Sequence, residues 1–488
     1  MGGGDQGLGS DGLRAGASTM NLVNDYLDPV AGGDWFSDAQ WLQALLRFES
    51  GLARAQADCG LIPEPAAQAI ASACAQVPLD RDRIVEQARI SGALGLALVK
   101  PLQQWLQAHA PQGLPWLHWG ATTQDAVDTA GVLLTRQAMQ SLLAELQSLI
   151  DALRELAQRH AATPMLARSL LQPAQITSFG FKCAQSAAAL QRSIDQFAQL
   201  APRALCVQLG GAVGNGATLG KHRQAVEQAL ARHLELEACG HSWHTQRDSW
   251  MRLAMEVAVC CGSLSKLARD WSLMSQYEVA EISEAARGST SSAMPHKRNP
   301  VHCMQAVAQT QAVPPLAALL LGCMAQAHER ALGEWQAEVA HWPELWRHAH
   351  GAAAALRQAA QTLQVHPQRM LAHVAGLRGL VFSEACVHAL APFTGKHEAL
   401  AAVEQLAPLA LEQQRELQEL LMEWAASRTA PELPTERLPA LRRALARACD
   451  PQEAVQASQR ECLALLASRS PTLSEESPAH AEHVRACL

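Results

Sequence analysis

Residues 126–160 of the chain read AVDTAGVLLTRQAMQSLLAELQSLIDALRELAQRH, with no proline and one glycine, Gly131. Apolar residues recur there every three or four positions: Val127, Ala130, Leu134, Leu142, Leu146, Leu149, Leu153 and Leu156. That spacing puts them on one face of an α-helix. We therefore predict a single helix roughly three times the mean length in globular proteins, a length typical of coiled coils and large bundles.

Four other stretches carry the same pattern, namely 174–200, 246–286, 301–329 and 334–365. We expect the Pro314-Pro315 pair to kink or restart the third helix, and Pro343 to interrupt the fourth. Residues 251–265 (MRLAMEVAVCCGSLS) are apolar or small on more than one face. A helix of that kind needs neighbours on every side. The sequence thus predicts a bundle over 116–365 that other copies of the chain complete.

Shorter helices are predicted on both sides of the bundle. Ser37 begins a capping box with Gln40 and opens an N-terminal helical domain over 20–115. A small C-terminal helical domain is expected over 366–455. Residues 1–19 are predicted to be a disordered tail and 456–488 a polar tail. We find no convincing set of strands, so the predicted fold class is mainly α, with three domains around a central long-helix bundle.

Composition excludes several classes of function. The net charge of −7, without runs of Lys or Arg, argues against a nucleic-acid partner. No apolar stretch is long enough to span a bilayer, so no membrane partner is expected. Thirteen cysteines without a CxxC pair indicate reduced thiols and a cytoplasmic protein. No metal or nucleotide motif is present, and GATLGK at 216–221 has the wrong spacing for a P-loop, so we expect no cofactor.

The chemistry is predicted to centre on Glu284–Pro300, EAARGSTSSAMPHKRNP. A run of small residues lets backbone N–H groups and hydroxyls point at anionic oxygens, here Gly288, Ser289, Thr290, Ser291 and Ser292. Lys297 adds a positive charge and Asn299 a neutral donor. The alternative is a flexible serine-rich loop without a ligand. The pattern favours a loop that binds a carboxylate-bearing molecule.

Four further motifs accompany this loop: HWGATTQDAVDTA at 118–130, RSLLQPAQITSFG at 168–180, WHTQRD at 243–248 and HERALGEWQAE at 328–338. In the first, Asp125 is placed to cap the long helix, and donors cluster beside it. Arg330 offers two parallel donors to a planar carboxylate. For His244, a helix-end position and a site role are equally compatible with the pattern. Residues 208–220 (QLGGAVGNGATLG) are expected to form a tight connection close to the site.

These motifs, in this order, resemble the fumarase/aspartase superfamily, which includes fumarases, aspartases, adenylosuccinate and argininosuccinate lyases and carboxymuconate cycloisomerases. The characteristic serine stands six residues before the lysine, as Ser291 does before Lys297. The resemblance implies a homotetramer whose sites are shared between subunits. It also implies catalytic roles for Ser291 and Lys297. Substrate-binding roles are implied for His118, Thr122, Thr123, Gln124, Arg168, Gln172, His244, Asn299 and Arg330.

Leu170 separates the activities within the superfamily. In the adenylosuccinate and argininosuccinate lyases the corresponding segment resembles RTHGQ. Its histidine handles the proton of the departing group in those enzymes. Here Leu170 stands at that position, and bacterial 3-carboxy-cis,cis-muconate cycloisomerases carry a similar RTLLQ-like run. A tethered reaction releases no separate group, so it needs no such histidine. The resemblance therefore implies a cycloisomerase of protocatechuate (beta-ketoadipate) catabolism acting on a small di- or tricarboxylate.

Two alternatives remain open at this point. One is an adenylosuccinate-type lyase, which Leu170 argues against. The other is a catalytically weak relative that keeps the fold. It is suggested by Ala93, which stands where the family tends to have Asn near the substrate, and by Thr290, which stands where the family usually has Gly.

Overall fold

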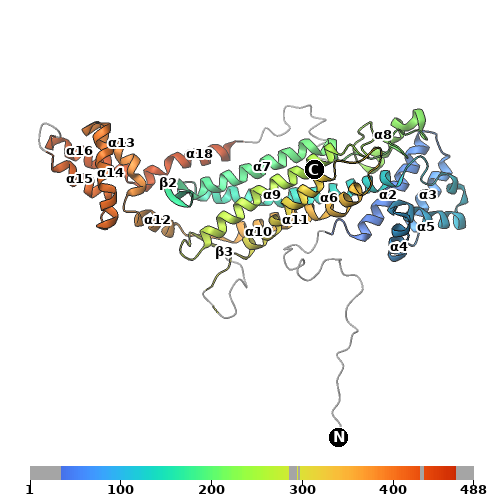
Figure 1. Cartoon of the computed structure of the whole chain (residues 1–488), viewed down its shortest axis with the longest axis horizontal. Coiled ribbons are helices and arrows are strands. Elements are labelled where there is room, and N and C mark those ends of the chain that lie inside the picture. The colour runs from blue at the N-terminus through green and yellow to red at the C-terminus, as the bar shows by residue number, and fades with distance from the viewer. Residues whose placement is uncertain (1–33, 285–293, 295–296, 429–433, 469–488) are drawn as a thin grey trace, which may run out of the picture.

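The computed structural model describes residues 34–284, 294, 297–428 and 434–468. Figure 1 shows three groups of helices along one long axis, with the bundle between the other two. The predicted tail at 1–19 lies outside the described residues, as do Thr290 and Ser291. The mainly α fold predicted from helical periodicity is confirmed.

Five long helices form the bundle: α6 (Thr123–Arg159), α7 (Phe179–Ala204), α9 (Asp248–Ser275), α10 (Val301–Gly322) and α11 (Glu334–Thr362). α6 packs against α7 and α11, and α10 packs against α9 and α11. Indole rings fasten α9 to α11, since Trp250 stacks on Trp342 with ring centroids 4.0 Å apart. The Trp342 indole also donates to Thr135 on α6 at 2.8 Å. This aromatic centre fixes the relative rotation of three helices whose ends carry the candidate site.

The N-terminal helices are α2 (Asp38–Asp58), α3 (Glu64–Gln76), α4 (Arg81–Ser91), α5 (Leu94–His109) and the 3₁₀ helix η1 (Pro111–Trp116). As predicted, the Ser37 side chain caps α2 by accepting from the Gln40 N–H. The first turns of α6 share the buried cluster of this group. So do α8 (Arg223–Leu234) and Leu219, which precedes the 3₁₀ helix η2 (Gly220–His222). Because α8 comes from later in the chain, the N-terminal core is closed by a segment that the 20–115 boundary did not include.

The C-terminal helices are α12 (Pro367–Gly376), η3 (Leu380–Phe382), α13 (Ser383–Thr394), α14 (Lys396–Glu412), α15 (Leu417–Ala426), η4 (Thr435–Arg437), α16 (Leu438–Ala448) and α17 (Pro451–Ala454). Most of their buried side chains form a third cluster. Among the described residues, no single helix is long and apolar enough to cross a membrane. The bent pair Pro367–Gly376 and Leu380–Thr394 passes that test by length and composition alone.

The polar tail predicted for 456–488 begins too early. Residues Gln456–Ala467 form helix α18, which returns along the bundle and packs against α7 and α6. Cys462 is buried against the bundle core, and the Arg154 guanidinium donates to the Leu466 carbonyl at 2.6 Å. A few apolar side chains in this otherwise polar segment therefore hold α18 against the bundle. The remainder of the predicted tail, from residue 469, lies outside the described residues.

The structure also contains strands, although the sequence offered no convincing set. β1 (Pro164–Ser169) pairs antiparallel with β2 (Gln172–Ser178), and the short β3 (Ile282–Glu284) pairs with β4 (Leu363–Val365). The helix predicted from residue 174 therefore starts later, at Phe179. β-branched Ile176 and Thr177 favour the strand, and the Ser178 side chain caps α7.

Other helix boundaries also differ from the prediction. α9 ends at Ser275, about ten residues earlier than the periodicity indicated, and a turn through Ala280 at φ +49° leads into β3. α10 continues through Pro314 and Pro315 without a restart, and α11 continues through Pro343. Packing of both helices within the bundle offsets the lost backbone hydrogen bonds.

Candidate active site

The carboxylate of Asp125 joins three segments that are far apart in the sequence. It is fully buried. One oxygen accepts the Gly210 N–H at 2.8 Å and lies 2.7 Å from His244 Nε2, while the other accepts the N–H groups of Gly211 and Thr122, each at 2.9 Å. The last bond completes a capping box, which confirms the predicted cap of α6. The same carboxylate thus holds the glycine-rich segment and His244 beside the first turn of that helix.

His244 is almost completely buried, and its orientation follows from this contact. Nε2 lies 2.7 Å from the Asp125 carboxylate, and Nδ1 has no hydrogen-bond partner among the described residues. The backbone carbonyl of His244 accepts from the Gln124 side chain at 2.9 Å. A Cβ on Gly210 would lie 2.8 Å from the His244 ring, so glycine is required for this close approach.

His118 is paired with a buried carboxylate that the sequence analysis did not single out. Its Nδ1 lies 2.6 Å from Glu49 Oε1, and its backbone has φ +59°. Burial disfavours the charged imidazole, but Glu49 outweighs this effect and raises the pKa of His118. The available signal was a lone acid within the apolar face of α2, next to Phe48. This pair therefore favours the protonated form of an imidazole at the same end of the bundle as Asp125.

Arg330 reaches this group of residues but does not present an open guanidinium. It donates to the Gln124 side chain at 2.8 Å and to the backbone carbonyls of Gly211 and Ala212 at 2.8 and 3.0 Å. In this structure it therefore fastens the segment before α11 to the glycine-rich segment. A direct role in holding substrate remains a proposal for Arg330.

A buried network of ion pairs lies beside this group. Arg247 donates to Asp128 at 2.8 Å and to Glu338 at 3.1 Å, so it connects the start of α9 to α6 and α11. Its guanidinium also lies 4.5 Å from the centroid of the Trp243 ring. Burial raises the pKa of the Glu338 carboxyl, although Arg247 opposes the shift. WHTQRD was recognised as a motif, but the two acids paired with its arginine lie too far away in sequence to be assigned from it.

The remaining predicted residues that the structure describes lie at the opposite end of the bundle. Arg168 makes two parallel bonds to the buried carboxylate of Glu281, at 2.7 and 3.0 Å. His373 Nδ1 lies 2.8 Å from the same carboxylate. The guanidinium is therefore already engaged in one chain, and its substrate-binding role stays a proposal.

Leu170 and Leu171 form the tip of the β1–β2 hairpin, and Gln172 follows at the first position of β2. Both leucines have left-handed backbone conformations, at φ +52° and +65°, and their exposed fractions are 94% and 76%. Such turns normally carry Asn or Gly, and bulky residues in strained conformations cost about 1–3 kcal/mol each. An exposed apolar tip held at that cost indicates a function outside the isolated chain.

The segment that holds Lys297 is anchored near this hairpin end by Glu284. Its carboxylate accepts the N–H groups of His302 and Cys303, each at 3.0 Å, at the start of α10. Lys297 and Asn299 line a cavity of about 600 Å³ together with residues of β3. The predicted catalytic Ser291 belongs to this segment but lies outside the described residues.

A single chain therefore divides the predicted site residues into two groups. We call them the Asp125 group (His118, Thr122, Thr123, Gln124, His244 and Arg330) and the loop group (Arg168, Gln172, Lys297 and Asn299). The 28 residues of α9 lie between His244 and β3. At 1.5 Å per residue, the helix separates the two ends by about 40 Å. Figure 1 shows α9 crossing the bundle between them.

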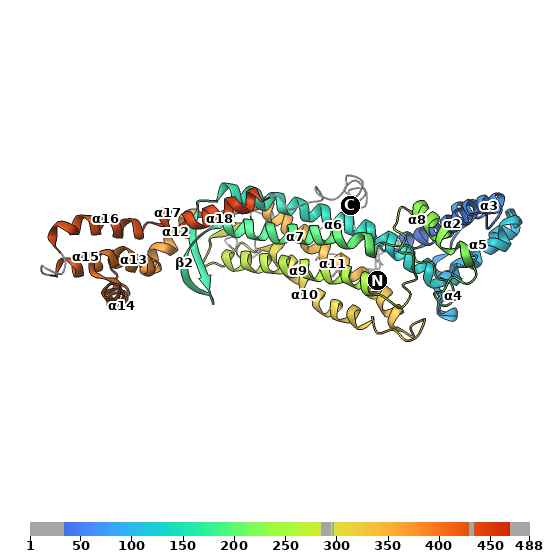
Figure 2. The same ribbon diagram turned by 90° about the horizontal axis from the view of Figure 1, so that it is seen from above.

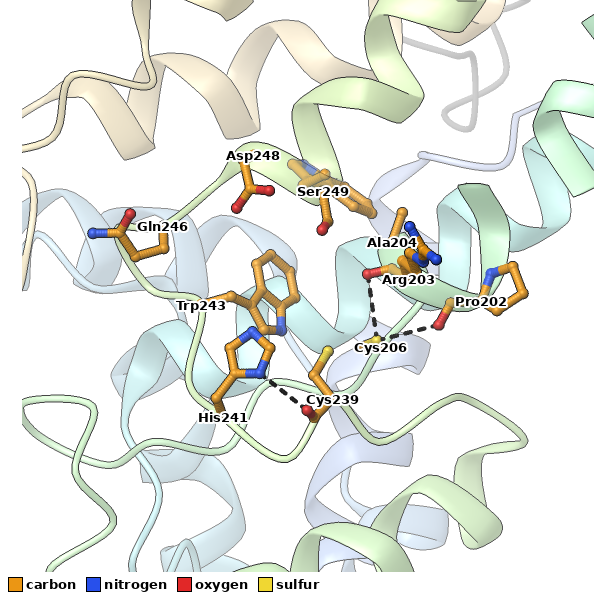
Figure 3. Close-up of a pocket in the computed structure, with 11 residues that line it drawn as sticks. Pro202, Arg203, Ala204, Cys206, Cys239, His241, Trp243, Gln246, Asp248 and Ser249 are labelled. Carbon is orange, nitrogen blue, oxygen red and sulfur yellow. Dashed lines mark hydrogen bonds between the residues drawn. The ribbon is translucent and has the colours of Figure 1, made fainter. Parts of the chain in front are cut away.

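Figure 3 shows a different pocket, of about 260 Å³, close to the Asp125 group. Trp243, Gln246 and Asp248 line it, together with Cys206 and Cys239. Its lining includes none of the predicted site residues. The pocket borders the WHTQRD segment, but it supports no assignment of the site.

Comparison with known proteins identifies the family. A family model described as lyase matches residues 34–313, more than half of the chain. The chain belongs to the fumarase/aspartase superfamily. This confirms the resemblance inferred from the five motifs.

Three similar proteins are named for the same activity. The chain is 39% identical to a 3-carboxy-cis,cis-muconate cycloisomerase of Bradyrhizobium diazoefficiens, over 83% of this chain and 90% of the relative. It is 40% identical to the enzyme of that name from Pseudomonas aeruginosa, over 80% and 85%. The crystal structure of the 3-carboxy-cis,cis-muconate lactonizing enzyme from Pseudomonas putida superposes with a TM-score of 0.84 at 32% identity, over 95% and 99%.

Proposed function

We propose that the chain is a 3-carboxy-cis,cis-muconate cycloisomerase of the beta-ketoadipate pathway. The observation that carries this proposal is its 39–40% identity, over at least four fifths of both chains, to relatives of that name. The product is a carboxymuconolactone, formed from the substrate without loss or gain of atoms. The Leu170 hairpin, which lacks a histidine, is in keeping with such a reaction.

The reaction places a specific demand on the protein. One substrate carboxylate attacks the double bond of the same molecule, a C–O bond forms, and the electron pair moves onto a second, conjugated carboxylate. Tethering supplies the nucleophile at high effective concentration. The dianionic carboxylate is costly unless donors already point at it. A proton must then be added to the adjacent carbon.

The loop group supplies groups suited to this demand. Lys297 and Asn299 line one cavity and provide a positive charge and an amide donor for the dianionic carboxylate. Ser291 would deliver the proton to carbon, and remove it in the reverse direction. A serine hydroxyl is a weak acid and base in water, so it needs the positive potential of the segment around Lys297.

The Asp125 group would bind the other carboxylates. His118, whose pKa is raised by Glu49, would provide a donor for one of them. Thr122 and Thr123 precede and begin α6, where the positive end of the helix dipole favours an anion. Asp125 keeps His244 in place, and Arg330 keeps Gln124 in place.

A shared site follows from the separation of the two groups. We propose a homotetramer in which the Asp125 group of one subunit meets the loop group of others. Apolar side chains exposed along α9 and α10 support burial by other subunits: Val259 (61% exposed), Leu273 (51%) and Met304 (50%). Every cysteine in the described residues is free, which supports a cytoplasmic location.

The decisive experiment follows the ultraviolet absorbance of 3-carboxy-cis,cis-muconate with the purified protein, and tests adenylosuccinate in parallel. We expect lactonisation with turnover of at least about 1 per second, within the normal range for enzymes, and no cleavage of adenylosuccinate. Cleavage of adenylosuccinate without lactonisation would favour the lyase. Inactivity of an assembled protein toward both compounds would favour a weak relative that keeps the fold.

A further inference from the structure

Two cysteines from separate elements meet in the C-terminal helices. Cys386 lies on α13, and Cys449 follows the last residue of α16, 63 positions later. Their Sγ atoms are 3.4 Å apart, and neither cysteine is in a disulfide. At this distance one thiol donates a hydrogen bond to the other. A disulfide therefore needs only a small further approach of the two sulfurs.

The two thiols are not equivalent. Cys386 is completely buried, whereas Cys449 is partly exposed at the end of its helix. The hydrogen bond between the two sulfurs lowers the pKa of the Cys449 thiol, although burial and Glu416 oppose the shift. The same contact raises the pKa of Cys386. Cys449 is thus the more accessible of the two sulfurs and the one whose pKa is lowered, and Cys386 is placed to react second.

We propose that Cys386 and Cys449 form a reversible, hydroperoxide-driven disulfide that clamps the C-terminal helices beside the β1–β2 hairpin. In the first step the Cys449 thiolate attacks the peroxide; an S–O bond forms, the O–O bond breaks, and hydroxide leaves. In the second, Cys386 attacks the resulting sulfenic acid; an S–S bond forms and water leaves. Two thiols lose two electrons in total, and one peroxide is reduced to two waters.

The position of the pair connects it to the hairpin tip. Glu384, two residues before Cys386, accepts a hydrogen bond from Gln175 on β2 at 2.8 Å. α17 begins two residues after Cys449 and packs against both β1 and β2. Figure 2 shows α17 and α12 next to β2. A bond between the sulfurs would therefore tie together two of the supports of the hairpin that carries Leu170.

The test does not depend on catalytic activity. The full-length protein is treated with one equivalent of hydrogen peroxide at neutral pH, its free thiols are alkylated, and its peptides are mapped by mass spectrometry. We expect a crosslinked Cys386–Cys449 peptide before other cysteines are consumed, and its loss on adding dithiothreitol. Amide hydrogen exchange of Pro164–Ser178 should slow in the oxidised protein.

Three variants make the outcome unambiguous. Cys386→Ser should stop at a sulfenic acid on Cys449, trapped by dimedone, and Cys449→Ser should show neither product. Cys239→Ser, which removes another partly exposed thiol, should still form the crosslink. Alkylation of Cys386 and Cys449 to the same extent as Cys59 after peroxide would mean that the pair is simple core packing. Unchanged exchange in the hairpin would contradict the proposed clamp.

Discussion

Single residues in this protein act through buried partners that come from distant parts of the chain. Asp125 was predicted as a helix cap and is one, but one of its oxygens also holds His244, 119 positions away. Glu49 has a similar effect on His118, 69 positions away. Each carboxylate contacts one ring nitrogen, Nε2 of His244 and Nδ1 of His118, and so fixes the orientation of its imidazole.

The Glu49–His118 pair predicts a pH-dependent contribution to stability. Because the pKa of His118 is raised in the folded state, its stabilisation is complete below the ordinary histidine value of about 6.5 and is lost as pH rises through the raised value. Glu49→Gln should therefore lower Tm most near pH 6, with a smaller difference by pH 9. Thermal unfolding across this range measures the effect.

The exposed pair of Asp58 and His233 provides the control. Asp58→Asn should change Tm little at any pH, because solvent screens the interaction. A difference between the wild type and Glu49→Gln that stays constant from pH 6 to 9 would show that the pair does not stabilise a charged imidazole.

Ser291→Ala should lower lactonisation turnover by at least about a hundredfold, the usual scale for losing a positioned proton donor. The fold should survive, because the change removes a single oxygen atom. Turnover is measured by substrate absorbance, and assembly by size-exclusion chromatography. Near-normal turnover in a correctly assembled variant would reject the role of Ser291.

At the level of elements, helical periodicity predicted the bundle because apolar spacing and capping are local properties. The structure confirms this at 126–160, where α6 occupies Thr123–Arg159. The β1–β2 hairpin was missed because its turn is Leu170-Leu171, not the Asn-Gly that signals such a turn. The sequence also could not predict the pairing of Arg168 with Glu281 or that of Arg330 with backbone carbonyls, because both depend on how separate elements pack.

The ion network between α6, α9 and α11 should contribute strongly to stability. Arg247→Met would leave the carboxylates of Asp128 and Glu338 buried without their cation, at a cost of about 3–5 kcal/mol. Chemical denaturation measures this cost. Arg252→Met on the same helix is the control, because its side chain is 70% exposed and its ion pair spans 3.9 Å. Equal losses of stability for the two variants would contradict a structural role of the network.

The hairpin tip provides a test of the reaction class. Leu170→His places a polar, titratable group where we propose that an apolar one shields a tethered nucleophile from water. We expect reduced lactonisation and no useful gain in adenylosuccinate cleavage, measured with both substrates on the purified variant. Leu171→His is the neighbouring control at the same turn. Clear adenylosuccinate cleavage by Leu170→His would overturn the cycloisomerase assignment.

At the level of the whole molecule, each site of the proposed tetramer contains residues from more than one chain. His118→Ala damages the Asp125 group, and Ser291→Ala removes the proposed proton donor that acts with the loop group, so each variant alone should be nearly inactive. If subunits are reassembled from an equal mixture, up to about a quarter of the sites contain two intact groups. Activity should reappear on mixing, as measured by substrate absorbance after unfolding and refolding together. Failure to recover any activity from well-assembled mixtures would contradict shared sites.

The length of α9 also has a genetic consequence. In the proposed tetramer, where the helix keeps the two groups of one chain about 40 Å apart, a chain damaged at both ends would spoil sites that it shares with undamaged chains. In a cell that expresses equal amounts of both, only about a quarter of the sites would be intact, although half of the chains are normal. Such an allele would be partially dominant. Second-site suppressors of a lesion in one group would map to residues of the other group and would act between chains.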